Sequence, residues 1–228
     1  AALDSALAFT RGDHFKPLAG YKVMGAHYHT GLVKRLRESG GLDNRLNDIE
    51  ALKAAGLDIF YPIDTGDGSP ITADESFLKS LAAYYDAARR QSDKDFLVMP
   101  DNEDLSSGIH GGILAHSDLL LSKPLYWIPK RAAGQPLVQE DPKYGKVYNI
   151  GSPDDMMKVT ELENALIYMP HPRSKGSTGF PDAIKDEAYF RHDNYRGMGY
   201  RWGMGIDASE IRLGEYRFQS TWDEVNNW

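Results

Sequence analysis

Apolar runs with the two-residue repeat of strands alternate along the chain with runs that have helical spacing. Strands are predicted at residues 21–29, 57–64, 95–103 and 165–172, and shorter ones at 111–116, 124–129 and 200–207. Helices are predicted at 41–56, from 72 to 91, at 152–164 and from 221 onward. This alternation is typical of an α/β fold with mostly parallel strands.

Cap and turn residues set the boundaries of the predicted helices. The helix from 72 begins with a capping box, and its apolar stripe is Phe77, Leu81, Tyr84 and Ala88. The helix over 152–164 has Ser152 at its N-cap and Pro153 at its first position. The helix over 41–56 has its stripe at Leu42, Leu46, Ile49 and Leu52 and ends at Gly56. Residues 132–151 are predicted to be irregular, with one short hairpin.

Polar residues repeatedly follow the apolar runs at their carboxyl ends. They are His27 and His29, Asp64, Asp101 and Glu103, His171, and Asp207. Residues i and i+2 of a strand point to the same face, so the two imidazoles of "HYH" are expected side by side. In a parallel barrel the carboxyl ends of all strands meet on one rim. In such a fold these side chains, far apart in sequence, would meet on that rim, and their recurrence favours a metal site over two isolated histidines.

Composition narrows the classes of partner and ligand. The chain has 228 residues, 41% of them hydrophobic, and a formal net charge of −7. This charge argues against nucleic acid or an anionic membrane as the main partner. No apolar run approaches the roughly 20 residues that span a bilayer. Because the chain has no cysteine, a metal site would use His, Asp and Glu, which suit zinc, manganese or iron.

Four motifs in order resemble the PHP (polymerase and histidinol phosphatase) family of metal-dependent phosphoesterases. They are "HYHTG" (27–31), "FYPIDTG" (60–66), "VMPDNED" (98–104) with the histidine of "IHGG" (109–112), and "MPHPR" (169–173). The resemblance covers residues 20–175. It implies a single metallohydrolase domain over residues 1–228, with an N-terminal extension at 1–19, folded as a distorted (β/α)7-type barrel.

The resemblance also implies a metal centre at the carboxyl rim of the barrel strands. His27 and His29 would hold one divalent ion together with Glu103. Glu103 would bridge to a second ion held by His110 and His171. A carboxylate suits this bridging position because it offers two oxygens, and two ions about 3.5–4 Å apart form a hydrolytic centre.

This sequence departs from the family pattern at two histidines. Thr65 stands after Asp64 where the family has a histidine, and Ser209 stands at the corresponding place after Asp207. Both missing histidines would serve one metal position, so two ions are expected rather than three, with Asp207 as a further ligand. The segment "TWDEVNNW" (221–228) resembles a helix that precedes the family's last aspartate. We therefore expect a barrel that is incomplete at its C-terminus, with that ligand beyond Trp228.

The expected activity is hydrolysis of a small-molecule phosphate ester. Asp64 and Glu103 would belong to the catalytic centre. Arg173, in the loop 171–179, would bind the phosphate, because guanidinium suits bidentate contact with phosphate oxygens. The segment 190–202 interleaves arginine with aromatic residues, a pattern that suits stacking on a sugar or base and equally suits plain surface packing.

Two alternatives from other classes remain open. One is a non-catalytic PHP-like module that binds metal without turnover, which the missing histidines favour. The other is a metal-free, carbohydrate-active barrel enzyme that uses a pair of carboxylates. The candidate pairs are Asp101 with Glu103 and Asp207 with Glu210.

Overall fold

The computed structural model describes residues 18–63, 75–103, 118–120, 123–129, 131–170, 172–173, 179–198 and 220–228. The strands are β1 (Met24–His29), β2 (Ile59–Ile63), β3 (Leu97–Val98), β4 (Asn102–Glu103), β5 (Asp118–Leu120), β6 (Tyr126–Pro129), β7 (Val138–Asp141), β8 (Gly145–Ile150), β9 (Leu166–Met169) and β10 (Tyr195–Met198). The helices are α2 (Leu32–Glu38), α3 (Ile49–Ala54), α4 (Glu75–Arg89), α5 (Pro153–Glu163), η2 (Ala188–Arg191), a 3₁₀ helix, and α7 (Ser220–Val225).

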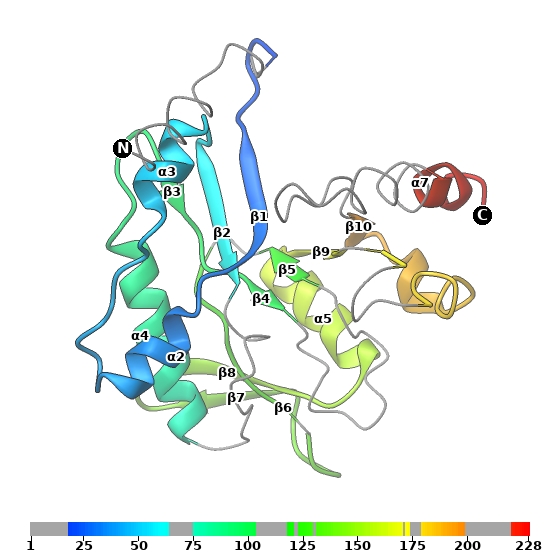
Figure 1. The fold of residues 1–228 in the computed structure, drawn as a ribbon. Helices are drawn as coiled ribbons and strands as arrows, with labels where there is room; N and C mark the ends of the chain where they lie inside the picture. The colour runs from blue at the N-terminus through cyan, green and yellow to red at the C-terminus, as the bar shows by residue number, and fades with distance from the viewer. Residues whose placement is uncertain are drawn as a thin grey trace.

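The strands form three small sheets (Figure 1). Sheet A has the order β1-β2-β3 and is parallel throughout. Sheet B has the order β10-β9-β5-β4, with β5 antiparallel to both of its neighbours. Sheet C has the order β6-β8-β7 and contains the hairpin β7–β8. The structure is a mixed α/β fold of separate sheets.

The predicted (β/α)7-type barrel is wrong, because the described strands do not join into one closed sheet. Two local features explain the difference. Residues 99–101 lie between β3 and β4, and the N–H groups of Met99 and Asp101 still donate to Phe60 and Pro62 of β2. Pro100 falls on the opposite side of the strand, where its missing N–H cannot pair with a further strand of sheet A. Residues 142–144 join β7 to β8 directly, which makes an antiparallel pair, whereas a parallel pair needs a crossover of a dozen residues or more.

Helix α4 supplies much of the core that supports sheets A and C. Its predicted stripe is confirmed: Phe77, Leu81, Tyr84 and Ala88 are all buried. Phe77 packs edge-on against the fully buried Trp127 of β6, with ring centroids 4.9 Å apart. This packing joins the first half of the chain to sheet C.

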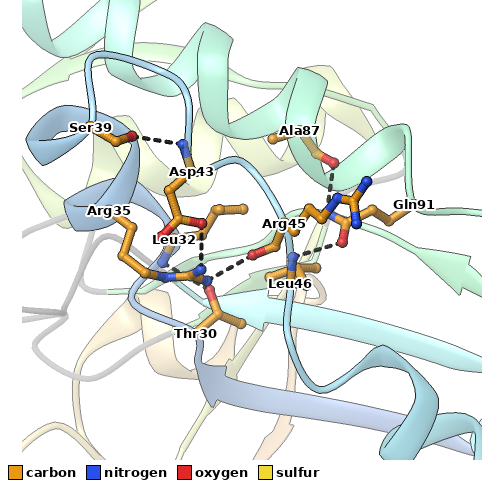
Figure 2. A network of polar contacts seen from close by, with 9 residues as sticks. All are labelled: Thr30, Leu32, Arg35, Ser39, Asp43, Arg45, Leu46, Ala87 and Gln91. Atoms are coloured by element: carbon orange, nitrogen blue, oxygen red, sulfur yellow. Dashed lines mark hydrogen bonds and ion pairs between the residues drawn. The ribbon is translucent and has the colours of Figure 1, made fainter.

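The segment between α2 and α3 differs from the prediction of one helix over 41–56. The helical part begins only at Ile49, and Leu42 is 86% exposed. Figure 2 shows what holds the preceding loop: Arg35 pairs with Asp43 at 2.9 Å and also donates to the Arg45 carbonyl. These long-range side-chain bonds outweigh the local helical spacing. The predicted stop at Gly56 is confirmed, since its φ of 87° suits glycine.

Candidate functional site

The carboxyl edge of sheet A brings polar residues from separate strands into one row. His29 of β1 is the register partner of Ile63 at the end of β2. Ile63 in turn forms a parallel bridge with Asp101, which follows β3. Because neighbouring strands lie about 4.8 Å apart, His29 and Asp101 stand two strand spacings apart on the same edge. This edge is the candidate functional site.

A β-bulge sets the orientation of the two histidines of β1 relative to each other. Ala26 and His27 together lie opposite the single residue Tyr61 of β2. His27 has a φ of 60°, a left-handed conformation that costs roughly 1–3 kcal/mol for a residue other than glycine. The ring centroids of His27 and His29 are 5.0 Å apart, with the rings nearly perpendicular. The expected adjacency is thus observed, but it arises from a bulge rather than from a regular pleat.

Gly25, just before the bulge, packs against the side chain of Leu57. A Cβ placed on Gly25 would lie 2.4 Å from Leu57 Cδ2 and 3.5 Å from Leu57 Cγ. Because Cδ2 is the end of a flexible side chain, a larger residue at position 25 would require Leu57 to change rotamer.

Asp101 is the buried carboxylate of this edge, with 0% of its surface exposed. Its Oδ1 accepts a hydrogen bond of 2.7 Å from the backbone N–H of Asn102. Burial, followed by the charge of Asp101, raises the pKa of Tyr61 in β2. Asp101 thus contributes a negative potential beneath the carboxyl ends of sheet A.

Two adjacent tyrosines of α4 form hydrogen bonds with the backbone and side chains at and next to this edge. The Tyr84 hydroxyl donates to the Pro62 carbonyl at 2.6 Å and lies 3.3 Å from the carbonyl of Asp101. The Tyr85 hydroxyl bonds to the Leu125 carbonyl and lies 3.3 Å from Asn102 Oδ1. Burial is the main cause that raises the pKa of Tyr85, so its hydroxyl keeps its proton and remains a donor. The sequence indicated only a buried stripe here and gave no sign of these polar roles.

The described structure places part of the predicted site. His27 and His29 lie on β1, and the backbone of Glu103 ends β4, where it pairs with Asp118 of β5. Glu103 therefore belongs to sheet B, two residues after Asp101 of the sheet A edge. Asp64, His110, His171 and Asp207 lie outside the described residues, as does Glu210. Within the described part of the chain, no three His, Asp or Glu side chains are grouped as a metal site requires.

Arg173, the residue predicted to bind phosphate, forms ion pairs with two carboxylates. Its Nε and Nη2 donate to Asp182 at 2.7 and 2.6 Å, and Nη2 also reaches Glu224 of α7. Asp182 and then Glu224 raise the pKa of the guanidinium, and Arg173 lowers the pKa of Asp182. A phosphate at Arg173 would have to compete with these two partners, which lie 9 and 51 residues away in sequence.

A charge cluster surrounds the buried carboxylate of Glu163 at the end of α5, and its two lysine side chains, Lys123 and Lys146, are 59% and 48% exposed. Lys123 Nζ lies 2.5 Å and Lys146 Nζ 3.4 Å from its carboxylate, and the Tyr148 hydroxyl donates to it. Burial acts to raise the pKa of Glu163, but hydrogen bonds from Lys123 and Tyr148 together with the lysine charges lower it overall. Burial and the bond to Glu163 raise the pKa of Tyr148. Each group has a partner, so the cluster fixes α5 against sheet C.

Comparisons with family models, with curated proteins and with solved structures find no match to this chain. The resemblance to the PHP family therefore stays a prediction that rests on the four motifs. Among the helices of the described ranges, none is long and apolar enough to cross a membrane.

Proposed function

We propose that the chain is a metal-dependent hydrolase of small-molecule phosphate esters, with its metal centre at the carboxyl edge of sheet A. One observation carries the proposal: two imidazoles lie side by side there, 5.0 Å apart, on a bulge with a left-handed His27. Strained backbone of this kind gathers at binding sites. Ligands of open α/β sheets also bind at the carboxyl ends of parallel strands.

The donor set suits zinc, manganese or iron, since it consists of imidazole and carboxylate groups. His27 and His29 would hold the first ion with Glu103, which would bridge to a second. The remaining ligands of the proposal are the residues outside the described ranges, namely Asp64, His110, His171 and Asp207. Bound divalent ions lower the pKa of water and neutralise charge on phosphoryl oxygens.

Asp101 is not proposed as a metal ligand, and its carboxylate instead supports the backbone where the chain passes from sheet A into sheet B at Asn102. Its carboxylate is buried, is bonded to the Asn102 N–H, and stands in the same row as His29. A glycosidase acid must reach the glycosidic oxygen, whereas Asp101 has no exposed surface. The pair Asp101 and Glu103 therefore supports the metal-free carbohydrate alternative poorly.

The test compares a double variant, His27→Ala with His29→Ala, with the control His192→Ala. His192 is a matched histidine because it is held elsewhere, by Glu161 at 2.9 Å and by the backbone of Asn194. Metal content is measured by elemental analysis. Turnover is measured on nitrophenyl phosphate and bis(nitrophenyl) phosphate with and without added manganese.

The double variant should lose metal and turnover together, while the control keeps both. Unchanged metal content in the double variant would contradict the proposal. Loss of two metal equivalents together in Glu103→Ala would support the bridging role. Metal binding without turnover on either ester would favour the non-catalytic alternative.

A further inference from the structure

A pocket of about 370 Å³ lies at the carboxyl ends of β9 and β10, where α7 closes one side. Met169 and Met198 are register partners at the ends of these two parallel strands, and both line the pocket. Lys185 lines the side before η2, and Trp228 lines the side that follows α7. Figure 1 shows α7 beside β10, away from sheet A. The pocket is thus a different place from the histidine edge.

The pocket concentrates positive charge in a chain whose net charge is −7. Lys185, Arg191 and Arg196 line it, and no Asp or Glu is among its described lining residues. The recorded acidic partners of these cations are Asp193, 4.0 Å from Arg196 and 92% exposed, and Asp182, whose pKa Lys185 helps to lower. The exposed pair with Asp193 neutralises little, and Asp182 is held mainly by Arg173. A local charge of this sign selects anions.

The same walls carry a connected set of aromatic rings. The ring centroid of Phe190 lies 5.1 Å from that of Tyr195 and 6.4 Å from that of Trp228. Lys185 Nζ lies 5.5 Å from the centroid of the Trp228 ring, so a cation sits next to an aromatic surface. Trp228 is 38% exposed, which leaves ring surface for a guest.

We infer that this pocket binds a small aromatic anion, meaning a planar ring that carries a phosphate-like or carboxylate group. The anionic group would lie among Lys185, Arg191 and Arg196, and the ring would pack against Phe190 and Trp228. The volume is within the range of small-molecule sites. This inference accounts for the interleaved arginines and aromatics of residues 190–202 as far as Met198, and it does not depend on the proposed metal centre.

The test is isothermal titration calorimetry of the full chain with phenylphosphonate, whose carbon–phosphorus bond resists hydrolysis. EDTA is present throughout, so that a metal centre cannot contribute to binding. Methylphosphonate supplies the anion without a ring, and benzyl alcohol supplies the ring without a charge. The variants are Lys185→Gln and Trp228→Leu. The matched control is Lys158→Gln, which removes an exposed lysine of α5 outside the pocket.

Phenylphosphonate should bind about tenfold more tightly than either partial ligand. Lys185→Gln should weaken its binding about fivefold, and Trp228→Leu should abolish the preference for the ring, while Lys158→Gln changes nothing. Equal affinity for phenylphosphonate and methylphosphonate would overturn the inference, as would equal binding by Lys185→Gln and Lys158→Gln. Binding that is unchanged in the His27→Ala, His29→Ala variant separates this outcome from that of the proposed hydrolase.

Discussion

Replacing Arg173 with methionine should release α7 from the rest of the molecule. The guanidinium links Asp182, in the segment 179–185, to Glu224 of α7 through one bidentate and one single contact. Methionine keeps much of the aliphatic stem but removes every donor. We therefore expect α7 to lose its ion pair with Arg173 while the buried core stays intact.

The size of the effect follows from the exposure of the groups. The Arg173 side chain is 24% exposed, and the Asp182 and Glu224 side chains are 45% and 50% exposed. Pairs with this much solvent contribute up to about 1 kcal/mol each, and bidentate geometry favours the upper end, so the loss should be about 1–2 kcal/mol. α7 has 6 residues, far fewer than the roughly 12 that let a helix persist alone. The loss should therefore appear as local opening of α7.

Hydrogen–deuterium exchange measures this opening directly. Amides of α7 should exchange about 5–30-fold faster in Arg173→Met than in the unaltered chain. Glu224→Gln should reproduce the effect in α7 and leave residues 179–185 protected. The control Arg90→Met removes an exposed pair between Asp86 of α4 and Arg90, the residue that follows α4, and should leave α7 unchanged.

Equal exchange of α7 in Arg173→Met and Arg90→Met would refute the reasoning. Inorganic phosphate adds a further arm, because an anion that captures Arg173 must displace its carboxylate partners. Faster exchange of α7 on adding phosphate would support the predicted phosphate-binding role, and unchanged exchange would argue against it.

Three further predictions concern buried or strained groups. Glu163→Gln should lower the free energy of unfolding, measured in urea at pH 7, by about 2 kcal/mol. The folded chain lowers the pKa of Glu163, so its stabilisation is present above the ordinary pKa near 4.5 and is lost as the pH falls through the lower folded pKa. The difference in stability between Glu163→Gln and the unaltered chain should therefore shrink at low pH. In thermal unfolding, His27→Gly should be about 1 kcal/mol more stable than His27→Ala, because glycine adopts the left-handed backbone without the strain that alanine keeps. Equal stability of the two variants would contradict this. Tyr85→Phe should cost about 1–3 kcal/mol in urea unfolding, since it strands the buried Leu125 carbonyl, and a cost near zero would show that the bond contributes nothing.

Apolar spacing and capping residues predicted the helices and the hairpin that short stretches of sequence determine. The stripe of α4 is buried as expected, and the Ser152 side chain accepts from the Asp155 N–H at the start of α5. The predicted hairpin within 132–151 is confirmed as β7–β8. The barrel was wrong because closure is decided by pairing between distant strands, and apolar periodicity does not encode which strands pair.

In the candidate site, too, local sequence predicted some features, while contacts between distant residues determined others. The spacing of His27 and His29 predicted their adjacency, but the bulge that produces it depends on pairing with β2. The sequence placed Asp101 at the carboxyl end of a strand and paired it with Glu103 in the carbohydrate-enzyme alternative, but it gave no sign that Asp101 is buried, since nothing local tells a buried carboxylate from an acidic turn. The partners of Arg173 could not be inferred, because Glu224 is 51 residues away.

The passage from β3 to β4 has a mechanical consequence. Asp101 bridges to Ile63 of sheet A, and the very next residue, Asn102, begins the strand that pairs in sheet B. Because one peptide unit joins the two sheets at this point, a displacement of one sheet is transmitted directly to the other. Sheets A and B should therefore unfold in one calorimetric transition. An ion bound by both His29 and Glu103 would link the two sheets a second time.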